Sequence, residues 1–357
     1  MANRITGSTD TTSSISIRAR SMKSVLLVCE KAATGSATAE QIYPVSGTSD
    51  AYTKFGEKVS KLVKILINNG VDNIKCVAIG EYGADEEYTD KASAYAAAMN
   101  ASLVDKGIMV IITDSTDATV ASAMKTHLAV AESEDMFRYG VVGLSATTIE
   151  EAVAEVSSIN SERVFAPFPH FVDDSGIVLD GAYGAAGMAA LILTETSDPA
   201  MPMNNVEFRG FGGTSMVLLK SDRTTLEQAG ITAIVGGSTP TIWRLVTTRL
   251  KSGETGDPTW HDGTTIFIAD NVLESVITTL QSTYKRTKNT SRILNAIRTT
   301  VIGILEAKEG LEIIENFDKN TVSVVQDPED IYGAVVDYEF DVVTPLYTIT
   351  ITQHMKL

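Results

Sequence analysis

The chain has only two cysteines, and this scarcity excludes a fold stapled by disulfides. Cys29 and Cys76 each lie inside a short apolar run that is typical of a buried strand. A disulfide framework or a structural metal site needs several cysteines, or cysteines and histidines at close spacing. We therefore expect two reduced thiols in a hydrophobic core.

Long apolar runs are missing as well. No stretch of about eighteen apolar residues occurs, and the first residues, MANRITGSTDTTSSISIR, lack the apolar centre of a signal peptide. We expect a protein that is made and kept in the cytoplasm and does not insert into a membrane.

Basic residues are fewer than acidic ones. The chain has 29 Lys and Arg against 45 Asp and Glu, which gives a formal net charge of −16. This balance argues against a protein whose main task is to grip nucleic acid, because phosphate binding requires an excess of positive charge. An acidic solvent-facing surface is the simple interpretation, and an acidic face for a basic partner is the alternative.

Motifs for catalysis or cofactor binding are also lacking. The turn after the first apolar run, EKAATGSATAEQIYP, matches neither G-x-G-x-x-G nor G-x-x-x-x-G-K-[ST], and the glycines of RGFGGTS fit a loop with unusual backbone angles. None of the four histidines has a ligand neighbour at metal spacing. His170 with Asp173 and Asp174 comes nearest to a site, but a solvated loop explains it better. We predict no catalytic, cofactor-binding or metal-binding residues, no cofactor, and no enzyme activity.

What the sequence does contain, between about residues 24 and 171, is a repeated alternation of strand and helix patterns. Apolar runs without polar alternation predict strands that are covered on both faces. Between them, helical spacing predicts helices over Tyr52 to Asn69, Asp90 to Asp105, Ala118 to Glu134 and Ile149 to Ser158. The runs are SVLLVCE, IKCVAIG, GIMVIITD, YGVVGLS and RVFAPF. This order predicts an α/β domain with a mostly parallel sheet.

The segment TSDPAMPMNN has no room for a regular element, so we place a domain boundary near Pro202. In the following region, PTIWRLVTTR is typical of a strand, and DGTTIFIADNVLESVITTLQSTYK of a strand or turn leading into a helix. The segments TVSVVQ and AVVDYEFDVVTPLYTITITQ predict strands near the end of the chain. Before them, an apolar stripe predicts one long helix from about Ser291 to Lys308. The stripe consists of Ile293, Leu294, Ile297, Val301, Ile304 and Leu305. The expected organisation is an arm over 1–22, an α/β domain over 23–201, an α+β domain over 202–338 and a second arm over 339–357.

Both ends of the chain carry strand-like alternation. Apolar and polar residues alternate over Ile15, Ser16, Ile17 and Arg18, and again over Tyr347, Thr348, Ile349, Thr350, Ile351 and Thr352. An unpaired strand at a chain end is an aggregation hazard unless it pairs with another chain. Each end of the chain therefore offers a strand edge that needs a partner.

A basic cluster stands out against the acidic background at YKRTKNTSR. Lys285, Arg286, Lys288 and Arg292 can favour the negative end of a helix dipole, or they can contact an acidic partner or a neighbouring copy.

The second region and the tails resemble the contractile tail sheath family of phages and of related particles such as R-type bacteriocins. The resemblance lies in LEQAGITAIVGG followed by PTIWRLVTTR, in TIFIADNVLESVITTLQSTYKRTKNT, and in the passage from PHFVDDSGIVLDGAYGAAGMAALILTE to VEFRGFGG. It covers about residues 165 to 357, and the N-terminal part matches only in general plan.

This resemblance implies a structural subunit that polymerises helically around an inner tube, exchanges terminal strands with its neighbours, and contracts to drive the tube through a cell envelope. It implies partners of four kinds: other copies of the chain, the tube protein, and baseplate and terminator proteins at the ends. The basic cluster becomes a candidate contact with the tube or a neighbour. It also implies synthesis in the cytoplasm of a bacterial host and assembly into a phage tail or a tail-like particle. The alternatives are another strand-exchanging filament or shell protein, and a cytosolic α/β nucleotide-binding enzyme.

Overall fold

The computed structural model describes residues 23–80, 90–253, 256–330, 332–347 and 353. The chain divides into two compact units. Of the described residues, those before Asp198 and Met203–His261 form unit 1, whereas Asp198–Pro202 and those after His261 form unit 2. We describe each unit by itself.

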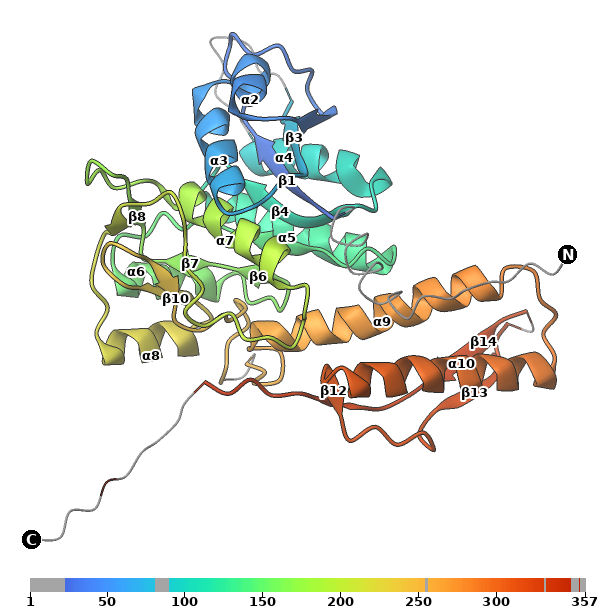
Figure 1. The fold of residues 1–357 in the computed structure, drawn as a ribbon. Coiled ribbons are helices and arrows are strands. Elements are labelled where there is room, and N and C mark those ends of the chain that lie inside the picture. Colours follow the sequence, from blue (N-terminus) through green and yellow to red (C-terminus); the bar gives the residue numbers. More distant parts are fainter. Residues whose placement is uncertain (1–22, 81–89, 254–255, 331, 348–352, 354–357) are drawn as a thin grey trace, which may run out of the picture. The chain divides into compact units, whose positions relative to one another are not determined.

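Unit 1 is built around a six-stranded sheet with the order β2-β3-β1-β4-β5-β6 (Figure 1). All strands run parallel except β2, which pairs antiparallel with β3. The strands are β1 (Ser24–Cys29), β2 (Ile42–Val45), β3 (Ile74–Ala78), β4 (Ile108–Thr113), β5 (Tyr139–Val141) and β6 (Val164–Phe165). Every residue of β1 and β4 is buried, as their unbroken apolar runs predict. The predicted α/β fold with a mostly parallel sheet is therefore confirmed.

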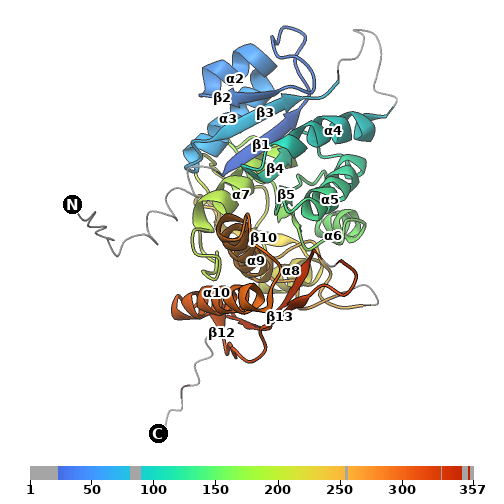
Figure 2. The ribbon, with the colours of Figure 1, turned by 90° about the vertical axis from the view of Figure 1, so that its right-hand side faces the viewer.

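Helices cover both faces of this sheet. Figure 2 shows α3 (Glu57–Asn68) and α7 (Gly181–Glu195) on one side, and α4 (Lys91–Asn100), α5 (Ala118–Ser133) and α6 (Ile149–Ser157) on the other. The helix predicted over Tyr52 to Asn69 is in fact two, α2 (Thr48–Phe55) and α3, because Gly56 between them has φ 106°. A Cβ at Gly56 would lie 2.5 Å from the Cβ of Ala32, so this break requires glycine.

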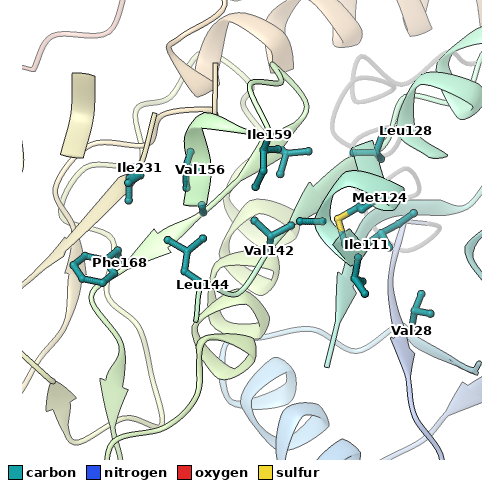
Figure 3. Packing of buried hydrophobic residues seen from close by; sticks show 14 of the residues in the cluster. Val28, Ile111, Met124, Leu128, Val142, Leu144, Val156, Ile159, Phe168 and Ile231 are labelled. Atoms are coloured by element: carbon teal, nitrogen blue, oxygen red, sulfur yellow. The ribbon is translucent and has the colours of Figure 1, made fainter. Parts of the chain in front are cut away.

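Apolar side chains between the sheet and the second helical layer form the main core of unit 1. Figure 3 shows buried side chains of this cluster, among them Val28 of β1, Ile111 of β4, Met124 of α5 and Val156 of α6. On the opposite face, α7 is buried along most of its length because its glycines and alanines allow close approach to the sheet. Cys29 and Cys76 lie in this interior as free thiols, which confirms the prediction made from their context.

Residues 203–261 pack with unit 1, although the sequence placed them in the second domain. The reason is long-range strand pairing: β10 (Thr232–Val235) pairs parallel with β7 (Pro167–Phe168), and Thr248 N donates to Val164 O at 2.7 Å. The same region contributes β8 (Phe171–Val172), β9 (Gly213–Thr214), α8 (Lys220–Gln228) and β11 (Thr241–Ile242). In the segment PTIWRLVTTR, expected to be one strand, only Thr241–Ile242 is a strand.

Unit 2 consists of two long helices and two small strand pairs. The helices are α9 (Gly263–Thr283) and α10 (Ser291–Gly310), and the strands are β12 (Ile314–Glu315) with β15 (Asp341–Val342) and β13 (Ser323–Gln326) with β14 (Ala334–Asp337). The predicted helix from Ser291 is confirmed. Its stripe is only partly covered within unit 2, because Val301 and Leu305 are buried whereas Ile293, Leu294, Ile297 and Ile304 are half-buried.

The start of the predicted C-terminal arm belongs to unit 2. The sequence placed the arm at 339–357, but β15 pairs antiparallel with β12, Ile314 opposite Val342. The arm as a separate segment therefore begins after Val342 at the earliest.

Candidate assembly surface

A cavity lies at the carboxyl ends of β1 and β4. The strand order of the sheet reverses between these two strands, which is where a doubly wound sheet places its ligands. The volume of the cavity is about 810 Å³, and charged side chains of both signs line it. Lys91 Nζ forms an ion pair with Glu30 Oε1 at 2.7 Å, whereas Lys58 Nζ donates to the backbone oxygen of Asp114 at 2.7 Å and lies 3.2 Å from Asp180 Oδ2. Both lysines are therefore already engaged within the protein.

Asp114 is the buried acid of this cavity, with 6% of its surface exposed. One carboxylate oxygen accepts from the Tyr95 hydroxyl and the other from Glu30 N at 3.1 Å. Burial raises the pKa of Asp114 to about 6, against the opposing effect of these hydrogen bonds. Both oxygens are therefore engaged within the protein.

The residues that came nearest to a catalytic or metal site have structural roles. His170 Nε2 lies 2.9 Å from Leu144 O, and Asp173 Oδ1 accepts from the backbone N–H groups of Ser175 and Ile177 in a turn. In the part of the chain that the structure describes, no group of three or more His, Cys, Asp or Glu side chains is placed to hold a metal ion. Among the same residues, no helix combines the length and apolar character needed to cross a membrane.

Of the alternating residues predicted to form the strands of the two arms, the structure describes one, Tyr347. Ile15, Ser16, Ile17 and Arg18 lie outside the described residues, as do Thr348, Ile349, Thr350, Ile351 and Thr352. Tyr347 is described, and its hydroxyl donates to Asp262 Oδ1 at 3.1 Å.

The hairpin β13–β14 offers strand edges to a partner. Val324 pairs with Val336, which packs against the unit 2 core, and Val325 pairs with Val335 on the outer face, where they are 51% and 42% exposed. Because this sheet has only two strands, the outer edge of each strand is not paired with a further strand among the described residues. The sequence predicted these strands but not their role, although the turn residues DPED between them signal the hairpin.

The basic cluster occupies the turn between α9 and α10. Lys285, Arg286, Lys288 and Arg292 are all exposed, and within the described residues none of them forms an ion pair. Asn289 Nδ2 in this turn donates to Gly333 O, in the loop between β13 and β14, at 3.0 Å. The basic cluster and the hairpin loop therefore lie at the same end of unit 2 (Figure 1).

Comparison with known proteins supplies the context for these surfaces. Among curated proteins, no sequence matches this chain. A chain of the anti-feeding prophage baseplate is similar in structure, with a TM-score of 0.73, 14% sequence identity and 94% of each chain covered. A chain of the contracted helical sheath of the anti-feeding prophage gives a TM-score of 0.69 at 14% identity, again with 94% of each chain covered. A sheath tail protein from Listeria innocua gives a TM-score of 0.69 at 11% identity, with 93% of this chain and 96% of the other covered. At these identities the likeness concerns the fold.

Two family models match the sequence itself. The phage tail sheath protein central domain matches residues 85–248, and the phage tail sheath C-terminal domain matches residues 255–356. The match to the central domain begins at residue 85. The resemblance inferred from the sequence motifs begins only at about residue 165. Because the two matches together cover most of the chain, the protein belongs to the phage tail sheath family.

Proposed function

We propose that this sheath subunit polymerises helically around an inner tube by exchanging terminal β-strands, and that the assembly contracts to drive the tube through a target envelope. It would act without catalysis or a cofactor. The observation that carries the proposal is the two-stranded hairpin of unit 2, whose outer edges have no ladder among the described residues, in a chain with alternating sequences at both ends.

The energetics favour a mesh over a pairwise contact. An arm that forms about four to six main-chain hydrogen bonds gains about 0.5 to 1.5 kcal/mol for each, plus the burial of residues such as Ile349 and Ile351. Ordering about ten residues costs about 1 to 2 kcal/mol for each in backbone freedom, so one arm alone gains little. The stability of a sheath would then come from many arms in a closed network. Such flexible links let subunits rotate during contraction without separating.

We propose β13–β14 as the acceptor of the arms. Strands added beside it would extend a sheet whose one face already packs on α10. Ile293, Leu294 and Ile297 on α10 are half-buried within unit 2, so added apolar side chains can complete their burial.

The other partners follow from the family and its relatives. Similar structures come from baseplates as well as from sheaths, which supports baseplate proteins as partners at one end, with terminator proteins at the other. We propose synthesis in the cytoplasm of a bacterial host and assembly there into a phage tail or a tail-like particle, without direct contact to nucleic acid.

The first test is assembly of the chain alone. We expect the purified protein to form hollow tubes under negative-stain microscopy, because donor arms and acceptor edge lie on the same chain. A uniform monomer that nucleotides stabilise in a thermal-shift screen would contradict the proposal and favour a nucleotide-binding enzyme.

The basic cluster supports a second test. Replacing Lys285, Arg286, Lys288 and Arg292 by Glu should change the unfolding free energy of the free subunit by less than about 1 kcal/mol, since all four are exposed. Binding to an acidic surface of the tube or of a neighbouring subunit should weaken, most clearly at low salt.

Assembly with and without purified tube protein separates the two partners. If the variant loses assembly only in the mixture with tube protein, the basic cluster contacts the tube. If it loses assembly in both mixtures, the cluster contacts a neighbouring subunit. A matched variant with four lysines replaced by Glu on unit 1 (Lys61, Lys64, Lys106 and Lys220) controls for the change in net charge. Unchanged assembly in both mixtures would exclude a contact role.

A further inference from the structure

Tyr347 is the first residue of the predicted C-terminal donor strand, and its side chain is held by its own subunit. The hydroxyl donates to Asp262 Oδ1 at 3.1 Å, across 85 positions of sequence. The same oxygen accepts from Thr264 N at 3.0 Å and from the Thr264 hydroxyl at 2.8 Å, because Asp262 is the N-cap of α9. An ionised acceptor at a helix N-terminus makes such hydrogen bonds stronger than neutral ones.

The chain just before Tyr347 is fixed as well. β15 pairs with β12, and Asn316 Nδ2 donates to Asp341 Oδ2 at 3.0 Å. Only residues 343–346 lie between β15 and Tyr347, and Leu346 is 70% exposed. The segment from β15 to Tyr347 is thus tied to unit 2 at both of its ends.

We propose that Tyr347 is a positioning residue that anchors the root of the donated strand to the N-cap of α9, so that the donated segment begins at Thr348. The inference rests on the proposed strand exchange and refines it. It also revises the role expected for Tyr347, since a hydroxyl held by Asp262 of its own subunit leaves Ile349 and Ile351 as the apolar residues of the donated face.

An anchored root matters because docking must overcome chain entropy. Each residue that is already fixed before docking no longer adds the loss of its backbone freedom to the cost of assembly. Anchoring also confines the donor strand to a smaller volume, which raises its effective concentration at the acceptor edge. Tyr347 therefore acts on assembly and not on the fold of unit 2, whose core consists of other residues.

The test is Tyr347→Phe, which removes one oxygen and keeps the ring. We expect the protein concentration at which tubes appear to rise about tenfold, equivalent to about 1.4 kcal/mol. The thermal midpoint of the free subunit, measured below that concentration, should not change. Tyr52→Phe is the matched control, because Tyr52 is 60% exposed on α2 in unit 1, and it should leave the threshold unchanged.

A double-mutant cycle tests the partner. Asp262→Ser keeps an N-cap acceptor but shortens the side chain, so it should raise the threshold about as much as Tyr347→Phe, and the double variant should be no worse than either single one. The inference would be overturned if Tyr347→Phe left the protein concentration at which tubes appear unchanged, or if the effects of the two substitutions on that concentration were additive. It would also be overturned if Tyr347→Phe lowered the thermal midpoint of the free subunit as well as assembly.

Removing Thr348–Leu357 separates this inference from the function on which it rests. If that truncation abolishes tubes while Tyr347→Phe assembles normally, the anchor is wrong and strand exchange stands. If the truncated chain still forms normal tubes, strand exchange through this arm itself fails.

Discussion

Removal of Thr348–Leu357 is expected to give a soluble, folded subunit that forms no tubes. In the proposed network each subunit both donates and accepts strands, so the loss of one arm would open every closed circuit of the network at once. The fold should survive because the buried cores of both units lie before residue 343. Circular dichroism and thermal unfolding would report on the fold, and sedimentation with negative-stain microscopy on assembly.

A finer version of this experiment keeps the length of the arm. In a paired strand, Ile349 and Ile351 point to one face and Thr348 and Thr350 to the other. Replacing both isoleucines by Asp should abolish tubes, because it would bury two unpaired charges. Replacing the two threonines by Asp is the matched control, and we expect those tubes to form with a raised threshold at most. Equal effects of the two pairs would contradict a strand with one buried face.

The success of the sequence interpretation depended on how local each signal was. The strands β1 and β4 were predictable because a strand buried on both faces must be apolar at every position. The break at Gly56 was missed because the apolar spacing of α2 and α3 continues across it. Only the contact with Ala32, distant in the sequence, shows why the backbone turns there.

At the start of α9 the sequence predicted a break from helical structure that the chain does not have. GTTIFIA, with its β-branched residues, was interpreted as a strand or turn leading into a helix. In the structure the helix begins at Gly263, because Asp262 caps it and Ile268, Val272 and Val276 are spaced to face the unit 2 core. Tertiary burial outweighed local propensity at this point. The misplaced boundary near Pro202 has a similar cause, since the pairing of β10 with β7 joins residues far apart in the sequence.

The assembly surface was predictable in part. The exposure of Lys285, Arg286, Lys288 and Arg292 agrees with a basic turn that stands apart from the core, while its partner stays a prediction. The arms, inferred from their period-2 alternation, also stay a prediction. The tie between Tyr347 and Asp262 could not be predicted, because no local pattern links two residues that are 85 positions apart.

The second large effect is a pair of opposite pH dependences within unit 1. His127 is 2% exposed, its Nδ1 lies 3.0 Å from Asn100 Oδ1, and its Nε2 lies 3.1 Å from Arg138 Nη1. Since the guanidinium can only donate, Nε2 accepts and the ring is neutral with its proton on Nδ1. Burial and the nearby Arg138 lower the pKa of His127 to about 4, while burial raises the pKa of Asp114 to about 6.

The two shifts act with opposite sign over nearly the same range. Between pH 6.5 and 4 the unfolded chain protonates His127 and the folded chain does not, so acidification destabilises the fold by about 3 kcal/mol at most. Between pH 6 and 3.8 the folded chain protonates Asp114 and the unfolded chain does not, so acidification stabilises the fold by a similar amount, about 3 kcal/mol. We therefore expect the two contributions largely to cancel in the natural protein.

Substitution should uncover each contribution in turn. In His127→Gln the unfolding free energy, relative to the natural chain at the same pH, should rise as the pH falls from 6.5 to 4. In Asp114→Asn it should fall over the same interval. Denaturant unfolding of unit 1 at several pH values measures both, and comparison with the natural chain removes the contribution of other carboxylates. Both substitutions also lower stability at every pH, so the slope against pH is the informative quantity. Slopes parallel to that of the natural chain would show that neither group titrates differently in the folded state, and that the cancellation does not exist.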